Sequence, residues 1–239
     1  MTETEWLKGE DPVPLLTFAA PTASRRKVRL ILTACCSRML ESTPPKRRSF
    51  RDRYEGSFHL LVGAHAVVER FADGLAGADE LAKARVDAKD ADYVPGWVDY
   101  GGETELYREV EAVLLVAADN PDPAAVIAAC AHATNTRPAP VPGGEDTRRV
   151  EEARWQAEVV RCVLGNPFLP VTFDPKWRTE TAVALASGIY AERAFDRMPI
   201  LADALQDAGC EDEHLLAHCR EPGPHVRGCW VVDLVLGKE

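Results

Sequence analysis

Residues 165–239 read GNPFLPVTFDPKWRTETAVALASGIYAERAFDRMPILADALQDAGCEDEHLLAHCREPGPHVRGCWVVDLVLGKE, and this stretch decides the fold. Gly165-Asn166-Pro167 is a stop signal for the helix before it, because proline cannot continue a helix and glycine is the usual cap. Asp212 and Gly237 are typical start and stop residues of two later helices. The stretch is therefore predicted to fold as one compact helical unit, with a core made of Trp177, Leu185, Ile189, Ile200, Leu201, Leu205, Trp230, Val231 and Leu234.

The chain before this stretch is expected to be helical as well. Alanine is abundant, aromatic residues make up only 7% of the 239 residues, and runs of β-branched residues are rare. Asp11-Pro12 and Ser24 mark the starts of two N-terminal helices. We therefore predict an all-α fold, an irregular helical bundle with little or no sheet. Its further helices are expected at 57–72, 79–89, 104–118, 123–134 and 146–164, with a loop at 93–102.

A segment rich in proline and glycine divides the chain. Residues 135–144 contain three prolines and two glycines, a composition typical of a linker. The predicted domains are an N-terminal helical lobe, residues 1–140, and a C-terminal helical lobe, residues 145–239. The hydrophobic content of 46% is high enough for both lobes to bury a core.

No stretch of the sequence predicts a membrane anchor or an export signal. The first residues are acidic and lack the pattern of a signal peptide, and no apolar stretch approaches the ~18–20 residues that cross a bilayer. The seven cysteines are an odd number, and Cys35 and Cys36 are adjacent, which does not fit a disulfide framework. We expect a cytoplasmic protein with reduced thiols and no membrane partner.

The net charge of −10 is unevenly distributed. Residues 25–53 carry ten basic and two acidic side chains, so this segment is positive while the rest of the chain is strongly negative. A basic segment of this kind can bind the phosphates of a nucleic acid. Because no nucleic-acid motif and no interleaved aromatic residues accompany it, we expect it to dock on the acidic remainder of the chain or to form a solvated helix face. The basic residues are Arg25, Arg26, Lys27, Arg29, Arg38, Lys46, Arg47, Arg48, Arg51 and Arg53.

Cysteines and histidines are concentrated between residues 210 and 229. Two histidines four residues apart share one face of a helix, and after the turn at 222–224 a histidine and a cysteine repeat that spacing. Two such pairs facing each other supply four ligands of the kind that tetrahedral zinc prefers. The competing interpretation, which we prefer at this point, makes the cysteines small core residues and lets the histidines cap carbonyls or face solvent. The candidate ligands are His214, His218, His225 and Cys229, with Cys219 as a substitute.

Several short motifs occur together at the two ends of the chain. The N-terminal ones are Trp6-Leu7, Asp11-Pro12, RKVRL at 26–30 and ACC at 34–36; the C-terminal ones are GNPF at 165–168, RAFDR at 193–197, LADAL at 201–205, HCR at 218–220 and HVRGCWVVD at 225–233. Together they resemble a family of uncharacterised helical proteins of the planctomycete type. The resemblance covers about half of the chain and is weaker over 44–144. It implies a helical fold, and it implies no activity, cofactor or catalytic residue.

No pattern in the sequence predicts a reaction. There is no phosphate-binding glycine loop, no Gly-x-Ser-x-Gly and no His-Glu-x-x-His. The neighbours His218 and Cys219 point in different directions on a helix, which disfavours a catalytic dyad. We therefore expect a non-enzymatic helical module that acts through another protein, without a cofactor. The alternatives are a zinc-binding module or enzyme centred on residues 210–229, and a nucleic-acid binder that uses residues 25–53.

Overall fold

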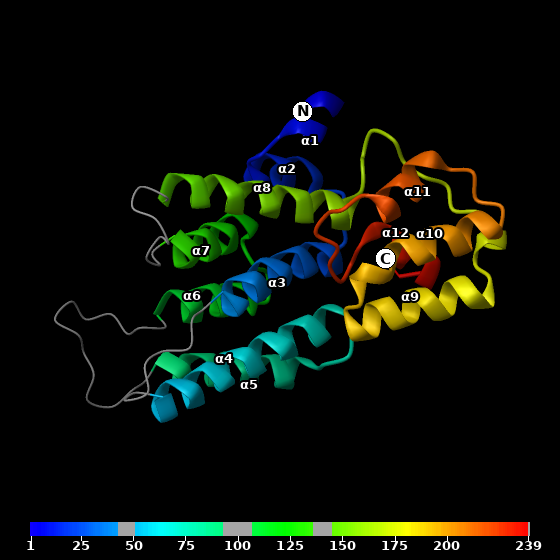
Figure 1. Cartoon of the computed structure of the whole chain (residues 1–239). Coiled ribbons are helices and arrows are strands. Elements are labelled where there is room, and N and C mark those ends of the chain that lie inside the picture. Colours follow the sequence, from blue (N-terminus) through cyan, green and yellow to red (C-terminus); the bar gives the residue numbers. More distant parts are fainter. Residues whose placement is uncertain (43–50, 93–106, 136–144, 239) are drawn as a thin grey trace.

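The computed structural model describes residues 1–42, 51–92, 107–135 and 145–238, and within these ranges it contains helices and no strand (Figure 1). The predicted all-α fold is confirmed. The predicted loop at 93–102 and nearly all of the predicted linker lie outside the described residues. The α-helices are α1 (Glu3–Lys8), α2 (Pro12–Ala19), α3 (Arg25–Glu41), α4 (Arg51–Ala72), α5 (Ala78–Asp92), α6 (Tyr107–Val116), α7 (Pro123–Asn135), α8 (Glu145–Leu164), α9 (Glu180–Glu192), α10 (Met198–Asp207), α11 (Glu213–Arg220) and α12 (Trp230–Leu236).

The predicted boundary residues begin and end helices as expected. The side chains of Asp11, Ser24 and Asp212 each accept a hydrogen bond from a backbone N–H in the first turn of α2, α3 and α11. These bonds satisfy donors that have no partner inside the helix. Gly165 and Gly237 follow the last residues of α8 and α12 with φ angles of 69° and 66°, a conformation that glycine adopts without steric cost.

Helix α3 lies at the centre of the larger group of helices (Figure 1). It packs against α4, α6, α7 and α8, while α2 covers α7 and α8. Most of the buried apolar side chains of α1 to α8 form one hydrophobic cluster, which includes Trp6, Ile31, Leu61, Val113 and Val160. No helix in the described part of the chain combines the length and the apolar character that a membrane span requires.

Helices α9 to α12 form a second group at one end of the molecule (Figure 1). Helix α10 packs on α9 and α11, and α12 packs on α9, α11 and α8. Most buried residues of α8 belong to the first cluster, but Cys162 in its last turn belongs to the second. Helix α8 therefore joins the two groups. The division into lobes 1–140 and 145–239 stays a prediction.

The second hydrophobic cluster contains most of the residues predicted for it. Ile189, Leu201, Leu205, Trp230 and Val231 are buried, and Trp177, Leu185 and Leu234 are partly buried. The prediction for Ile200 is wrong, because this side chain is 53% exposed. Adjacent residues on a helix point about 100° apart, so α10 buries Leu201 and turns its neighbour to the surface.

The basic side chains of α3 are mostly engaged within the molecule. Arg26 and Arg38 form ion pairs with acidic residues of other helices and loops. Lys27 donates to the carbonyl of Val163, and Arg29 donates to three carbonyls at the end of α6 and just after it. The expected docking on acidic residues is confirmed for Arg26, Arg38 and Lys27, whose Nζ lies 3.9 Å from Asp233 Oδ2. Arg29 docks on backbone carbonyls instead. The side chains of the remaining basic residues of this segment lie outside the described part: Lys46, Arg47, Arg48, Arg51 and Arg53.

Candidate metal centre

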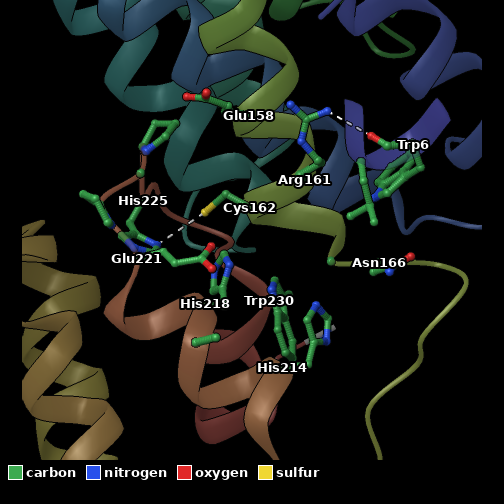
Figure 2. Close-up of a pocket in the computed structure, with 16 residues that line it drawn as sticks. Trp6, Glu158, Arg161, Cys162, Asn166, His214, His218, Glu221, His225 and Trp230 are labelled. Atoms are coloured by element: carbon green, nitrogen blue, oxygen red, sulfur yellow. Dashed lines mark hydrogen bonds between the residues drawn. The ribbon is translucent and has the colours of Figure 1, made fainter. Parts of the chain in front are cut away.

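Two cysteines and two histidines from separate elements meet where α8 reaches the second group of helices. Figure 2 shows three of them, Cys162, His218 and His225. Cys162 stands in the last turn of α8, and His218 stands in the last turn of α11. His225 follows the turn at 222–224, and Cys229 is the residue directly before α12. One ligand atom from each of the four residues lies within 4.8 Å of all the others.

The shortest separations in this cluster are those of direct polar contacts. His218 Nε2 lies 3.3 Å from Cys229 Sγ. His225 Nδ1 lies 3.9 Å from Cys162 Sγ and 4.0 Å from Cys229 Sγ. The rings of His218 and His225 meet edge to face with their centroids 4.9 Å apart. Both cysteines are buried, at 3% and 0% exposure, and both histidines are partly buried.

Three of the four predicted ligands meet in this cluster, and the fourth position differs from the prediction. His214 is separated from His218 by the ring of Trp230 (Figure 2), and the rings of His214 and Trp230 stack with their centroids 5.2 Å apart. Cys219 is buried in the second hydrophobic cluster. Neither belongs to the group of converging donors, and Cys162 takes the place that they were expected to fill.

Sequence reasoning missed Cys162 because nothing near it marks it as a ligand. It lies on a long helix among Val159, Val160 and Val163, which are all buried. A lone cysteine in such a pattern is typical of a core residue. It reaches the other donors only because the end of α8 packs against α12.

Hydrogen bonding distributes protons unevenly among the four side chains. Burial opposes ionisation of Cys229, but hydrogen bonds with Cys162 and His218 and the charge of His218 outweigh it, so the pKa of this thiol lies well below its usual range. The pKa of Cys162 is raised well above its usual range, first because its S–H donates a hydrogen bond to Cys229 and then because of burial. Burial lowers the pKa of His225, yet the bond to Cys229 outweighs this and raises it overall. The cluster thus already stabilises one thiolate, the form in which cysteine binds metals.

A pocket of about 330 Å³ opens beside the four donors (Figure 2). Cys162, His218 and His225 line it, together with Trp6 and Arg161. Cys229 is not among the lining residues and is 0% exposed. Small molecules in solvent therefore meet Cys162 before they meet Cys229.

Gly228 sets the position of Cys229 and tolerates no side chain. Its φ angle is 88°, and a Cβ atom at this position would lie 2.9 Å from Cδ1 of Leu30. The close approach lets the segment before α12 rest directly on α3. The backbone conformation and the contact together explain why glycine stands next to Cys229.

The substitution Gly228→Ala is expected to destabilise the protein by about 1–3 kcal/mol, because alanine is strained at positive φ and its methyl group collides with Leu30. Urea denaturation of wild type and variant measures this difference. Gly223→Ala is the matched control: it lies in the same loop, has no positive φ angle, and its added Cβ meets no atom within 4 Å. Equal stabilities of the two variants would contradict the prediction.

Comparisons with known proteins identify no relative: no protein-family model, no curated protein and no solved structure matches the chain.

Proposed function

We propose that this protein binds one zinc ion through Cys162, His218, His225 and Cys229, and that the ion ties the end of α8 to the unit formed by α9 to α12. The observation that carries the proposal is the convergence of four donors from elements far apart in sequence. It supports zinc binding more directly than any feature of the chain supports the interaction-module or nucleic-acid alternatives. With four protein ligands, the ion would have a structural role.

The donor types and their spacing fit zinc. Thiolate and imidazole are the ligands of structural zinc sites, whereas magnesium and calcium prefer oxygen ligands. Bonds of ~2.0–2.3 Å in a tetrahedron place the ligand atoms ~3.3–3.8 Å apart. Three of the observed separations are 3.3, 3.9 and 4.0 Å, and all lie within 4.8 Å, so the donors reach these values by side-chain movements of about 1 Å.

The position of the site explains what the ion would do. Cys162 belongs to a helix whose other buried residues pack in the first cluster, while the remaining three donors come from α11, the following turn and the start of α12. These last elements are short: α11 has eight residues and α12 has seven. Helices of this length are not stable alone. A metal bridge would therefore hold the C-terminal unit on α8.

Metal analysis of the purified protein tests the proposal. We expect one zinc ion per chain, and at a free zinc concentration 100 times the dissociation constant we expect stabilisation of about 2.7 kcal/mol. Cobalt in place of zinc should give the visible spectrum of a tetrahedral thiolate site. Cys162→Ala should lower the zinc affinity by at least about 10–100-fold, the loss typical even of an outer-shell partner.

Cys219→Ala is the matched control for this experiment. Cys219 is also a buried cysteine of the second hydrophobic cluster. Its replacement by alanine therefore removes a buried sulfur atom, as Cys162→Ala does, but removes no proposed zinc ligand. Wild-type zinc content in Cys219→Ala together with loss in Cys162→Ala supports the site. A wild-type chain that binds no zinc, or equal loss in both variants, contradicts it.

A further inference from the structure

We infer that Cys162 and Cys229 form a peroxide-sensitive pair, in which oxidation to a disulfide expels the zinc ion and replaces the metal bridge by a covalent one. The inference rests on the proposed zinc site and adds its regulation by a hydroperoxide. It is carried by three observations: the two sulfur atoms lie within 4.8 Å of each other, only Cys162 lines the pocket, and Cys229 is 0% exposed.

The pocket determines which sulfur reacts first. Cys162 lines the pocket beside the two histidines, and Figure 2 shows its sulfur pointing toward His225. Hydrogen peroxide is about the size of a water molecule or two and fits in a space of about 330 Å³. Cys229 is 0% exposed and does not line the pocket, so it is placed to act second.

The chemistry balances with one hydroperoxide. In the zinc complex both cysteines are thiolates. The sulfur of Cys162 attacks one peroxide oxygen, the O–O bond breaks, hydroxide leaves, and Cys162 becomes a sulfenic acid. The thiolate of Cys229 then attacks that sulfur, the S–S bond forms and a second hydroxide leaves. The two hydroxides take two protons from solvent to give water. Two electrons pass from the sulfurs to the peroxide, and zinc dissociates because two of its four thiolate and imidazole ligands are gone.

The chain contains a second close pair of cysteines that serves as an internal control. Cys36 and Cys130 have their sulfur atoms 3.5 Å apart. Both are 0% exposed inside the first hydrophobic cluster, and neither lines the pocket beside the zinc site. If proximity alone decided the reaction, this pair would oxidise at least as fast. If access through the pocket decides it, Cys36 and Cys130 stay reduced.

The experiment treats the zinc-loaded full chain with hydrogen peroxide. Released zinc is followed with a colorimetric chelator, and disulfides are located by mass spectrometry of unreduced peptides. We expect one zinc ion released for each disulfide between Cys162 and Cys229, reduced thiols at Cys36 and Cys130, and recovery of zinc binding after treatment with dithiothreitol. The Cys219→Ala variant should behave like wild type.

Three results would overturn the inference: zinc that stays bound in peroxide, zinc loss with sulfinic acids in place of the disulfide, or equal oxidation of the Cys36–Cys130 pair. The same treatment of a chain stripped of metal separates the two proposals. A disulfide between Cys162 and Cys229 in a chain that binds no zinc would contradict the proposed function and leave the redox pair standing. Zinc binding without that disulfide would support the proposed function and contradict the redox pair.

Discussion

Replacement of Trp230 by alanine is expected to lower the free energy of unfolding by about 3–5 kcal/mol, the usual cost of removing a large buried aromatic side chain. Trp230 is 7% exposed. Its ring stacks on His214, lies 5.3 Å from the ring of His218, and closes over Gly165, where an added Cβ would be 3.4 Å from the indole. On the side of Gly165 there is no side chain that could move into the space left by the indole. For a chain of this length the melting temperature should fall by about 6–20 °C.

Trp177→Ala provides the comparison for this prediction. Trp177 belongs to the same unit and also has an aromatic neighbour, Phe173, at 5.4 Å, but it is only partly buried. Its loss should cost about 1–2 kcal/mol. Calorimetry of both variants checks the order of the two effects. A Trp230→Ala variant that melts with wild type would mean that the tryptophan does not hold the unit together.

Replacement of Arg26 by methionine is expected to destabilise the protein by a similar amount, about 3–5 kcal/mol. Arg26 Nη1 lies 2.7 Å from Asp233 Oδ2, Nε lies 2.8 Å from Asp73 Oδ1, and Nη2 donates to the hydroxyl of Tyr190 at 2.9 Å. The side chains of both carboxylates are 1% exposed. Methionine fills much of the space but leaves two buried charges without their main partner. Arg25→Met, at the exposed neighbouring position, should change stability by no more than about 0.5 kcal/mol.

The loss in Arg26→Met should also depend on pH. Burial raises the pKa of Asp233, and Arg26 opposes this, so the pKa is raised only in part in the wild type. A carboxyl group with a raised pKa holds its proton more tightly in the folded chain than in the unfolded one. The ionised group therefore destabilises the fold at a pH above the raised pKa, and this destabilisation disappears as the pH falls through that pKa. Without Arg26 the pKa of Asp233 rises further. Chemical denaturation at pH 5 and pH 8 should therefore show a smaller deficit at pH 5, and a deficit that grows as the pH falls would contradict this account.

Five helix boundaries follow from the sequence alone, whereas others differ from the prediction: α4 begins at Arg51 and not at residue 57, and α6 spans Tyr107–Val116 and not 104–118. Asp11, Ser24 and Asp212 begin helices and Gly165 and Gly237 end them, as predicted. These signals work because a capping side chain reaches a backbone group only two or three residues away, and a positive φ angle is a property of a single residue. The apolar spacing likewise identified five buried residues of the C-terminal core.

The detailed burial pattern required the tertiary structure. Spacing cannot decide between Ile200 and Leu201, since both are apolar and adjacent, and only the packing of α10 on α9 and α11 turns one inward. Similarly, the basic character of α3 was plain in the sequence. That Arg26 meets Asp73 and Asp233 depends on how α12 and the end of α4 lie against it.

The candidate metal centre also combines residues that the sequence indicates with one that only the tertiary structure reveals. His218, His225 and Cys229 lie within a short stretch joined by a tight turn, and their spacing was enough to name them as candidate ligands. Cys162 belongs to another helix, and its neighbours in sequence are core valines. A ligand set is defined by the positions of atoms within a few ångströms, whereas sequence patterns report only on residues that are close along the chain. Local chemistry therefore determined that the chain is helical and which three residues are candidate donors, and only the packing of α8 on the C-terminal helices placed the fourth candidate, Cys162, beside them.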